Sequence, residues 1–197
     1  MSTAVVEKRL LRQRLRNLWR GAPQPGAVAT ELLPYVLTLC GKSSSSDGST
    51  DQRTPVVAGF IRYGHEVDVE RLLNEVKAQG FGIALPQVTG DDITFVTWDS
   101  HSLTEGAYGL LEPVDAAAIS DEQIRVVLVP AMACSTDGIR LGRGGGYYDR
   151  ALARMPASAH FICIIDDDAV MPAGSIPRED HDVRMHAIAT PTRVLTC

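Results

Sequence analysis

The fold of this chain is constrained most by an apolar, β-branched run. A long loop, a glycine-rich segment and a helix follow this run. Residues 125–130 (RVVLVP) have the composition of a buried strand, and the glycine-rich segment at residues 140–150 reads RLGRGGGYYDR. Residues 147–155 favour a helix that stops before Pro156. Anions bind at the carboxyl end of a parallel strand facing a helix N-terminus, so this order favours an α/β protein with an anion site. A flexible surface turn is the alternative interpretation of the glycines.

Strands and helices alternate along most of the 197 residues. The pattern predicts three helices in this part of the chain: one at about 4–20, one from the break at 21–26 to about Leu39, and one at 68–79. It predicts strands at 55–61, 81–85, 92–98, 125–129, 160–165, 187–189 and 192–195. Residues 100–122 are expected to be irregular, and the Ser/Gly/Asp-rich stretch at 41–53 is expected to be a flexible loop. We therefore expect a single domain over residues 1–197, a three-layer, Rossmann-like α/β sandwich with a largely parallel central sheet flanked by helices.

Charge and composition argue against several classes of protein. Residues 1–20 carry six basic side chains against Glu7 alone, whereas the whole chain has a net charge of −5, so its body is acidic. A body without a basic stripe is not typical of nucleic-acid binding. No apolar run approaches the ~20 residues of a membrane span and no apolar signal region is seen, so we expect a cytoplasmic protein without a membrane partner. The four cysteines form no Cys-x-x-Cys pair, which suits a reduced compartment better than a zinc or disulfide framework.

The first predicted helix has an apolar face and a basic face. The apolar face consists of residues at helical spacing, namely Leu11, Leu15, Leu18 and Trp19. Lys8, Arg12 and Arg16 share the basic face, where like charges repel by a few tenths of a kcal/mol per pair. An anion docked between them would offset this repulsion, and a solvated basic face is the alternative.

The glycine-rich segment has the residue types that a nucleotide triphosphate requires. Its glycines leave backbone N–H groups bare, and Arg140 and Arg143 add forked donors for phosphate oxygens. Asp149 supplies a hard oxygen of the kind Mg²⁺ prefers. The segment contains no lysine, which excludes a Walker loop, and Tyr147 occupies the third glycine position of a dinucleotide fingerprint.

The segment from Leu141 to Arg150 closely resembles the signature of the 5-formyltetrahydrofolate cyclo-ligase family, also called methenyltetrahydrofolate synthetases. Further matches follow in the family's order, namely Lys8-Arg9-Leu10-Leu11-Arg12, Glu66-Val67-Asp68, Trp98, Tyr108-Gly109-Leu110-Leu111-Glu112-Pro113, Pro177 and His181-Asp182. The resemblance implies an enzyme that uses ATP and Mg²⁺ to convert 5-formyltetrahydrofolate to 5,10-methenyltetrahydrofolate. ATP would phosphorylate the formyl oxygen, N10 would attack the activated carbon, and ADP and phosphate would be released.

The resemblance also implies site residues. ATP would be bound by Lys8, Arg9, Arg12, Arg140, Leu141, Gly142, Arg143, Gly144, Gly145, Gly146, Tyr147 and Tyr148. The folate would be bound by Ile61, Glu66, Arg143, Gly144, Gly145, Gly146 and Tyr147. Arg143 and Tyr147 would be catalytic, and Mg²⁺ would be held by Asp149 and Asp182. ATP and the folate are the expected partners of a monomer.

Each of these roles has a plainer alternative. Tyr147 could be a core residue, and Glu66 could be a surface residue that opens a helix. Asp149 could be a first-turn carboxylate favoured by the helix dipole, and Asp182 could cap its own turn. Two other function classes stay open at this level: a sugar-phosphate isomerase or CoA-transferase-like enzyme, and a folate- or nucleotide-binding protein without turnover.

Two further groups of polar residues are expected to have no part in the chemistry. The carboxylates at 166–168 follow a predicted strand and favour a solvated turn or a helix cap over a metal site. His65 precedes Glu66 and is expected to be an exposed loop histidine.

Overall fold

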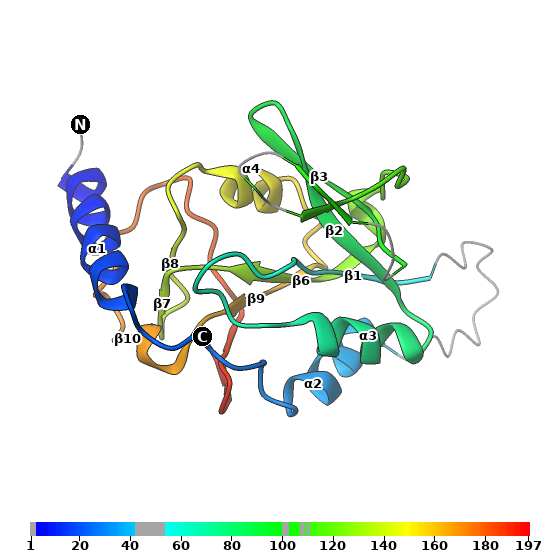
Figure 1. The fold of residues 1–197 in the computed structure, drawn as a ribbon, viewed down its shortest axis with the longest axis horizontal. Helices are drawn as coiled ribbons and strands as arrows, with labels where there is room; N and C mark the ends of the chain where they lie inside the picture. The colour runs from blue at the N-terminus through cyan, green and yellow to red at the C-terminus, as the bar shows by residue number, and fades with distance from the viewer. Residues whose placement is uncertain (1–2, 42–53, 100–102, 107–108, 110) are drawn as a thin grey trace.

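Figure 1 shows the computed structural model, which describes residues 3–41, 54–99, 103–106, 109 and 111–197. The α-helices are α1 (Thr3–Trp19), α2 (Leu32–Cys40), α3 (Glu70–Ala78) and α4 (Tyr147–Ala153). The strands are β1 (Val56–Ala58), β2 (Gly82–Thr89), β3 (Asp92–Thr97), β4 (Leu103–Glu105), β5 (Leu111–Pro113), β6 (Ile124–Pro130), β7 (Ala133–Ser135), β8 (Arg140–Leu141), β9 (His160–Ile164), β10 (Val170–Met171), β11 (Ala187–Ala189) and β12 (Val194–Thr196). The flexible loop expected at 41–53 lies, apart from Gly41, outside the described residues.

A seven-stranded sheet in the order β12-β11-β9-β6-β1-β2-β3 forms the centre of the molecule. The five inner strands run parallel, with Val127 of β6 opposite Phe161 of β9. The two edge strands are antiparallel, because β3 returns from β2 by a tight turn and β12 returns from β11. The largely parallel α/β sheet predicted from the alternation of elements is confirmed.

Both faces of the central sheet are buried, which explains the continuous apolar run in β6. Val126 and Leu128 belong to a core cluster with residues of α2 and α3, whereas Val127 and Val129 belong to a second cluster with residues of α1 and α4. Figure 1 shows α2 and α3 on one side of the sheet and α4 on the other. A strand covered on both faces needs apolar residues at every position rather than at alternate ones.

The shortest elements differ from the prediction. Residues 100–122 were expected to be irregular, but β4 and β5 pair there as a two-stranded antiparallel sheet. Strands β10, β7 and β8 form a further small sheet where no strands were expected. Strands of two or three residues carry almost no periodicity, so the sequence gives no local signal for them. β1 ends at Ala58 rather than 61, where Gly59 passes so close to Leu73 that a Cβ would lie 2.6 Å from its methyls.

The first helix has nearly the predicted bounds, but one residue of its predicted apolar face is exposed rather than buried. Leu15 is buried, and Leu11 and Trp19 pack against the core, whereas Leu18 is 63% exposed. α1 lies at one edge of the molecule, where its inner face approaches the glycine-rich segment (Figure 1). Within the described ranges, no helix has the length and apolar character needed to cross a membrane.

Candidate active site

A cavity of about 400 Å³ opens where α1, the glycine-rich segment, the loop between β1 and α3, and residues 179–182 meet. Its lining includes most of the predicted site residues, namely Lys8, Arg12, Ile61, Glu66, Arg140, Gly142, Arg143, Gly144, Gly145, Gly146, Tyr147, Tyr148, Asp149 and Asp182. Its cationic and glycine residues come from α1 and the glycine-rich segment, whereas most of its apolar residues come from β2, β3, β5 and the loop after β1. We call these two parts of the lining the cationic end and the apolar end. The fold therefore brings together side chains that lie up to 174 residues apart in the sequence.

The glycine-rich segment turns sharply between β8 and α4. Gly144 and Gly146 have φ of 108° and 72°, a region that other residues rarely adopt, and α4 begins directly after Gly146. Gly145 has no such dihedral requirement, but a Cβ there would lie 2.9 Å from the ring of Tyr147. The absence of a side chain at position 145 therefore lets the Tyr147 ring fold back against the segment.

Arg140 is anchored beneath this segment. Its Nη2 donates to Asp149 Oδ1 at 2.8 Å and its Nη1 donates to the carbonyl of Pro130 at 3.2 Å. The guanidinium lies 5.7 Å from the centroid of the Tyr148 ring. Only 5% of the Arg140 side chain is exposed, and its Nε is buried without a partner among the described residues. This buried cation is therefore fixed before any ligand binds.

Arg143 spans the cavity to the loop between β1 and α3. Its Nε donates to Glu66 Oε1 at 3.0 Å, and its Nη2 lies 2.9 Å from the same oxygen. Burial raises the pKa of Glu66 above its usual value, and the charge of Arg143 partly offsets this rise. The glycine-rich segment and the loop that carries Glu66 are thereby joined by a salt bridge.

Helix α1 contributes two cations in different environments. Arg12 Nε donates to the carbonyl of Gly142 at 2.7 Å, which ties α1 to the glycine-rich segment. Lys8 is buried, and its Nζ donates to Asp182 Oδ2 at 2.5 Å and to Glu179 Oε2 at 3.1 Å. Of the three residues on the predicted basic face, only Arg16 is exposed, so a solvated face describes Arg16 but not Lys8.

Carboxylates at two places in the cavity offer oxygen ligands for a cation. Glu179, His181 and Asp182 have ligand atoms within 4.8 Å of one another, and Asp182 Oδ2 also accepts from the backbone N–H of Glu179 at 2.7 Å. Asp149 lies in the first turn of α4 and uses one oxygen on Arg140. Carboxylate oxygens are the ligands that Mg²⁺ prefers in proteins, so Glu179, Asp182 and Asp149 fit that ion.

The other end of the cavity could hold a flat, largely apolar ring. Its lining residues there are Phe60, Ile61, Pro86, Val88, Ile93 and Leu111. Glu66 adds a carboxylate acceptor, and the buried hydroxyl of Tyr148 has no partner among the described residues. Burial is the main cause that raises the pKa of Tyr148, followed by the charge of Glu66, so this hydroxyl keeps its proton.

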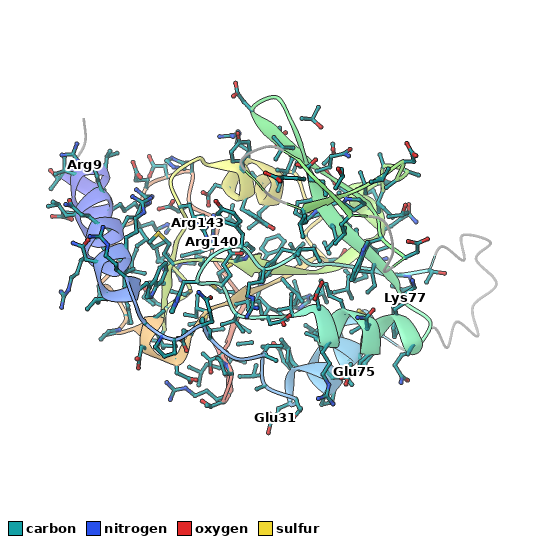
Figure 2. All side chains as sticks on the ribbon, viewed as in Figure 1. Arg9, Glu31, Glu75, Lys77, Arg140 and Arg143 are labelled. Carbon is teal, nitrogen blue, oxygen red and sulfur yellow. The ribbon has the colours of Figure 1, made fainter. Side chains whose placement is uncertain are left out.

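Two predicted site residues do not line the cavity. Arg9 is exposed on α1 and Leu141 is fully buried in β8. Figure 2 labels Arg9 at the outer end of α1, with Arg140 and Arg143 nearer the middle of the molecule. The expectation of an exposed His65 was wrong: its side chain is 9% exposed, stacks on Trp19 at 4.9 Å and lies 3.8 Å from Asp166. The predicted cap is confirmed, since Asp166 Oδ1 accepts from the N–H of Asp167.

Sequence reasoning missed several residues at the site. Glu179 was overlooked, although it stands between Pro177 and His181 in a segment that had already been matched. Tyr63 was also missed, although its ring lies 5.1 Å from the Arg143 guanidinium. No motif or spacing in the sequence indicates Tyr63, because its contact with Arg143 joins residues 80 positions apart.

The fold and the cavity together define a Rossmann-like α/β protein with a cationic, glycine-lined end that suits phosphates and an apolar end that suits a ring. The model of the family described as the 5-formyltetrahydrofolate cyclo-ligase family matches residues 5–191. The chain belongs to this family, and the resemblance predicted from its motifs is confirmed.

Individual relatives agree with this assignment. A 5-formyltetrahydrofolate cyclo-ligase of Mycolicibacterium smegmatis is 33% identical over 147 residues, which cover 70% of this chain and 74% of the relative. The mitochondrial 5-formyltetrahydrofolate cyclo-ligase of Arabidopsis thaliana is 28% identical over 162 residues, which cover 66% of this chain and 56% of the plant protein. The NMR structure of Aquifex aeolicus 5,10-methenyltetrahydrofolate synthetase has a TM-score of 0.68 at 24% identity, covering 96% of this chain and 92% of that one. This last likeness supports the fold.

Proposed function

We propose that this protein converts 5-formyltetrahydrofolate to 5,10-methenyltetrahydrofolate at the expense of ATP, with Mg²⁺. One observation carries the proposal: a single cavity has an arginine- and glycine-lined end for phosphates and an apolar end bordered by Glu66 for the folate ring. Family membership supports the folate as substrate. It leaves the alternative of a sugar-phosphate isomerase or CoA-transferase-like enzyme without support.

The chemistry requires the two substrates to meet end to end. The formyl oxygen attacks the γ-phosphorus of ATP, the bond to the bridging oxygen breaks, and ADP leaves. N10 then attacks the formyl carbon, loses its proton, and expels the phosphate with its oxygen. Phosphoryl transfer depends mainly on positioning and on neutralising charge, so the protein needs fixed cations and donors rather than a nucleophile.

The residues of the cationic end have complementary parts in this proposal. Arg12, Arg140 and the backbone N–H groups from Gly142 to Gly146 bind the phosphates. Arg143 stands between the phosphates and the folate, where it stabilises the charge on the transferring group. Tyr147 borders the folate. Lys8 is held in an ion pair with Asp182. To contact the phosphates of ATP, its ammonium group would have to rearrange this pair.

The carboxylates would hold the metal. Asp149 and Asp182 bind Mg²⁺ in this proposal, and Glu179 joins them because its ligand atom lies close to that of Asp182. When bound, Mg²⁺ neutralises phosphate charge and favours attack on the γ-phosphorus. In the absence of the ion these residues are paired with Lys8 and Arg140, which limits the cost of burying their charges.

The decisive experiment mixes the purified protein with Mg²⁺, ATP and 5-formyltetrahydrofolate and follows the absorbance of the methenyl product. We expect product formation that requires all three additions and releases one ADP per methenyl group. Binding of both compounds without product would favour a binding protein, and absence of folate binding would refute the proposal. A monomeric, cytoplasmic protein without nucleic-acid or membrane partners stays a prediction, which sedimentation can test for the oligomeric state.

A further inference from the structure

The loop between β1 and α3 forms a socket around the Arg143 guanidinium. Besides its salt bridge to Glu66, Arg143 donates through Nη2 to the carbonyl of Tyr63 at 2.7 Å. The guanidinium carbon lies 5.1 Å from the centroid of the Tyr63 ring, which is within the range of a cation–π contact. The backbone N–H of Tyr63 in turn donates to Glu66 Oε2 at 3.0 Å. Tyr63 therefore contacts both members of the ion pair.

The residue after Tyr63 sets the turn of this loop. Gly64 has a φ of 63°, and a Cβ placed there would lie 3.6 Å from Arg143 Nη2. A residue other than glycine would strain the turn that points the Tyr63 carbonyl at Arg143. Tyr63 and Gly64, which form the socket together with Glu66, are not among the residues assigned to ATP, folate or metal.

Arg143 needs such support because of where it stands. Its side chain is 47% exposed, and it rises from a segment whose neighbouring glycines contribute no side chains to pack against it. A long, half-exposed arginine would otherwise distribute over many rotamers, and only some of these place its donors toward a transferring phosphoryl group. Ring, carbonyl and carboxylate together restrict the guanidinium before substrates arrive.

We propose that Tyr63 is a positioning residue for the reaction, which holds the Arg143 guanidinium in its working orientation at the junction of the two substrates. This inference rests on the proposed function of the cavity. Tyr63 acts through Arg143, because its carbonyl and ring face the guanidinium. Removing the ring leaves the backbone bonds and the Glu66 salt bridge in place, so the substrates should still bind while Arg143 samples more orientations.

The test compares Tyr63→Ala with Tyr63→Phe. We expect Tyr63→Ala to lower kcat by about two- to fivefold, the factor that corresponds to an exposed cation–π contact, with smaller changes in the KM values of ATP and folate. Tyr63→Phe keeps the ring and should restore kcat. Leu18→Ala removes an exposed apolar side chain from the outer part of α1 and serves as the matched control, with wild-type kcat expected. Melting temperatures of all four proteins should agree.

The results that overturn the inference differ from those that overturn the function. A wild-type kcat in Tyr63→Ala, or a kcat in Tyr63→Phe as low as that of Tyr63→Ala, would rule out positioning by the ring. A rise in folate KM together with a lower melting temperature would point to loop destabilisation instead. If the wild-type protein forms no methenyl product from ATP and folate, the proposed function fails, and the positioning role of Tyr63 fails with it.

Discussion

At the scale of single residues, the site contains charged groups that already have partners. Asp149 pairs with Arg140, Asp182 pairs with Lys8, and Glu66 pairs with Arg143. Each of these pairs joins a residue predicted to bind metal or folate with a residue predicted to bind phosphate. Because these groups already carry structural contacts, substitutions will act on both the folded state and the chemistry.

Asp149→Asn should lower kcat much more than it raises the KM of the folate. The amide keeps an acceptor for Arg140 but removes a charged ligand from the proposed metal site. Loss of even an outer-shell partner of a metal ligand typically costs about 10- to 100-fold in metal affinity or activity, so we expect a loss of at least this size. The Mg²⁺ concentration for half-maximal rate should rise in parallel. Steady-state kinetics with a Mg²⁺ titration measures both. Asp168→Asn, at an exposed position outside the cavity, should behave like wild type, and an unchanged kcat in Asp149→Asn would remove its metal role.

The pKa of Glu66 predicts a pH dependence of folate binding. Because burial raises this pKa, Glu66 takes up a proton at a higher pH than an ordinary glutamate with a pKa of about 4.3. The contribution of the Glu66 carboxylate to folate affinity is therefore fully present above the raised pKa, and it is lost as the pH falls through that pKa. The pH dependence of folding stability has the opposite sign. Because the pKa of Glu66 is higher in the folded state, the ionisation of Glu66 lowers the stability of the fold as the pH increases.

This dependence can be measured as the KM of the folate against pH. Wild type should show a rise toward acid pH, whereas Glu66→Gln should show a higher KM that is flat over the same range. The KM of ATP, measured in the same series, is the internal control. An identical acid limb in wild type and in Glu66→Gln would assign the titration to another group.

At the scale of elements, the position of α1 matters most for the site. A helix at the start of the chain is joined to the glycine-rich segment by Arg12 and to residues 179–182 by Lys8. Its predicted amphipathic pattern required an apolar face against the core, which Leu15 supplies. Periodicity indicates that such a helix docks, but it does not indicate which element receives the opposite face.

Lys8→Met should lower the free energy of unfolding by about 3–5 kcal/mol. The substitution leaves the buried carboxylate of Asp182 without its cation, and breaking one partner of a buried pair costs about this much. Urea denaturation followed by circular dichroism gives the value. Arg9→Met changes an adjacent exposed cation and should stay within about 0.5 kcal/mol of wild type. Equal stability of the two variants would mean that the Lys8 pair contributes nothing to docking α1.

At the scale of the whole molecule, we expect the stability of the fold not to depend on a metal. The central sheet is covered on both faces by apolar clusters, and the proposed metal ligands are paired with cations of the protein. A chelator should therefore abolish methenyl formation while leaving the melting temperature of the substrate-free protein unchanged. Activity should return when Mg²⁺ is added in excess. A melting temperature that falls on chelation would show a structural metal.

Much of this architecture could be predicted from the sequence, and the failures have two causes. Long apolar runs and amphipathic helices indicated the central sheet and its layers, since their periodicity is local. The strands of two or three residues in β7, β8 and β10 were missed because so few residues carry no pattern. His65 was placed wrongly because its burial depends on Trp19 and Asp166, which lie far from it in the sequence.

The α/β class, the glycine-rich segment and, through its motifs, the family could all be read from the sequence alone. These depend on neighbouring residues, whose backbone preferences and order along the chain can be read directly. The tertiary structure alone decided that Lys8 meets Asp182, that Arg143 crosses to Glu66, and that Tyr63 encloses the guanidinium. Such contacts depend on the path of the whole chain, because the packing of the sheet and helices, and not local preference, brings distant side chains within hydrogen-bonding distance.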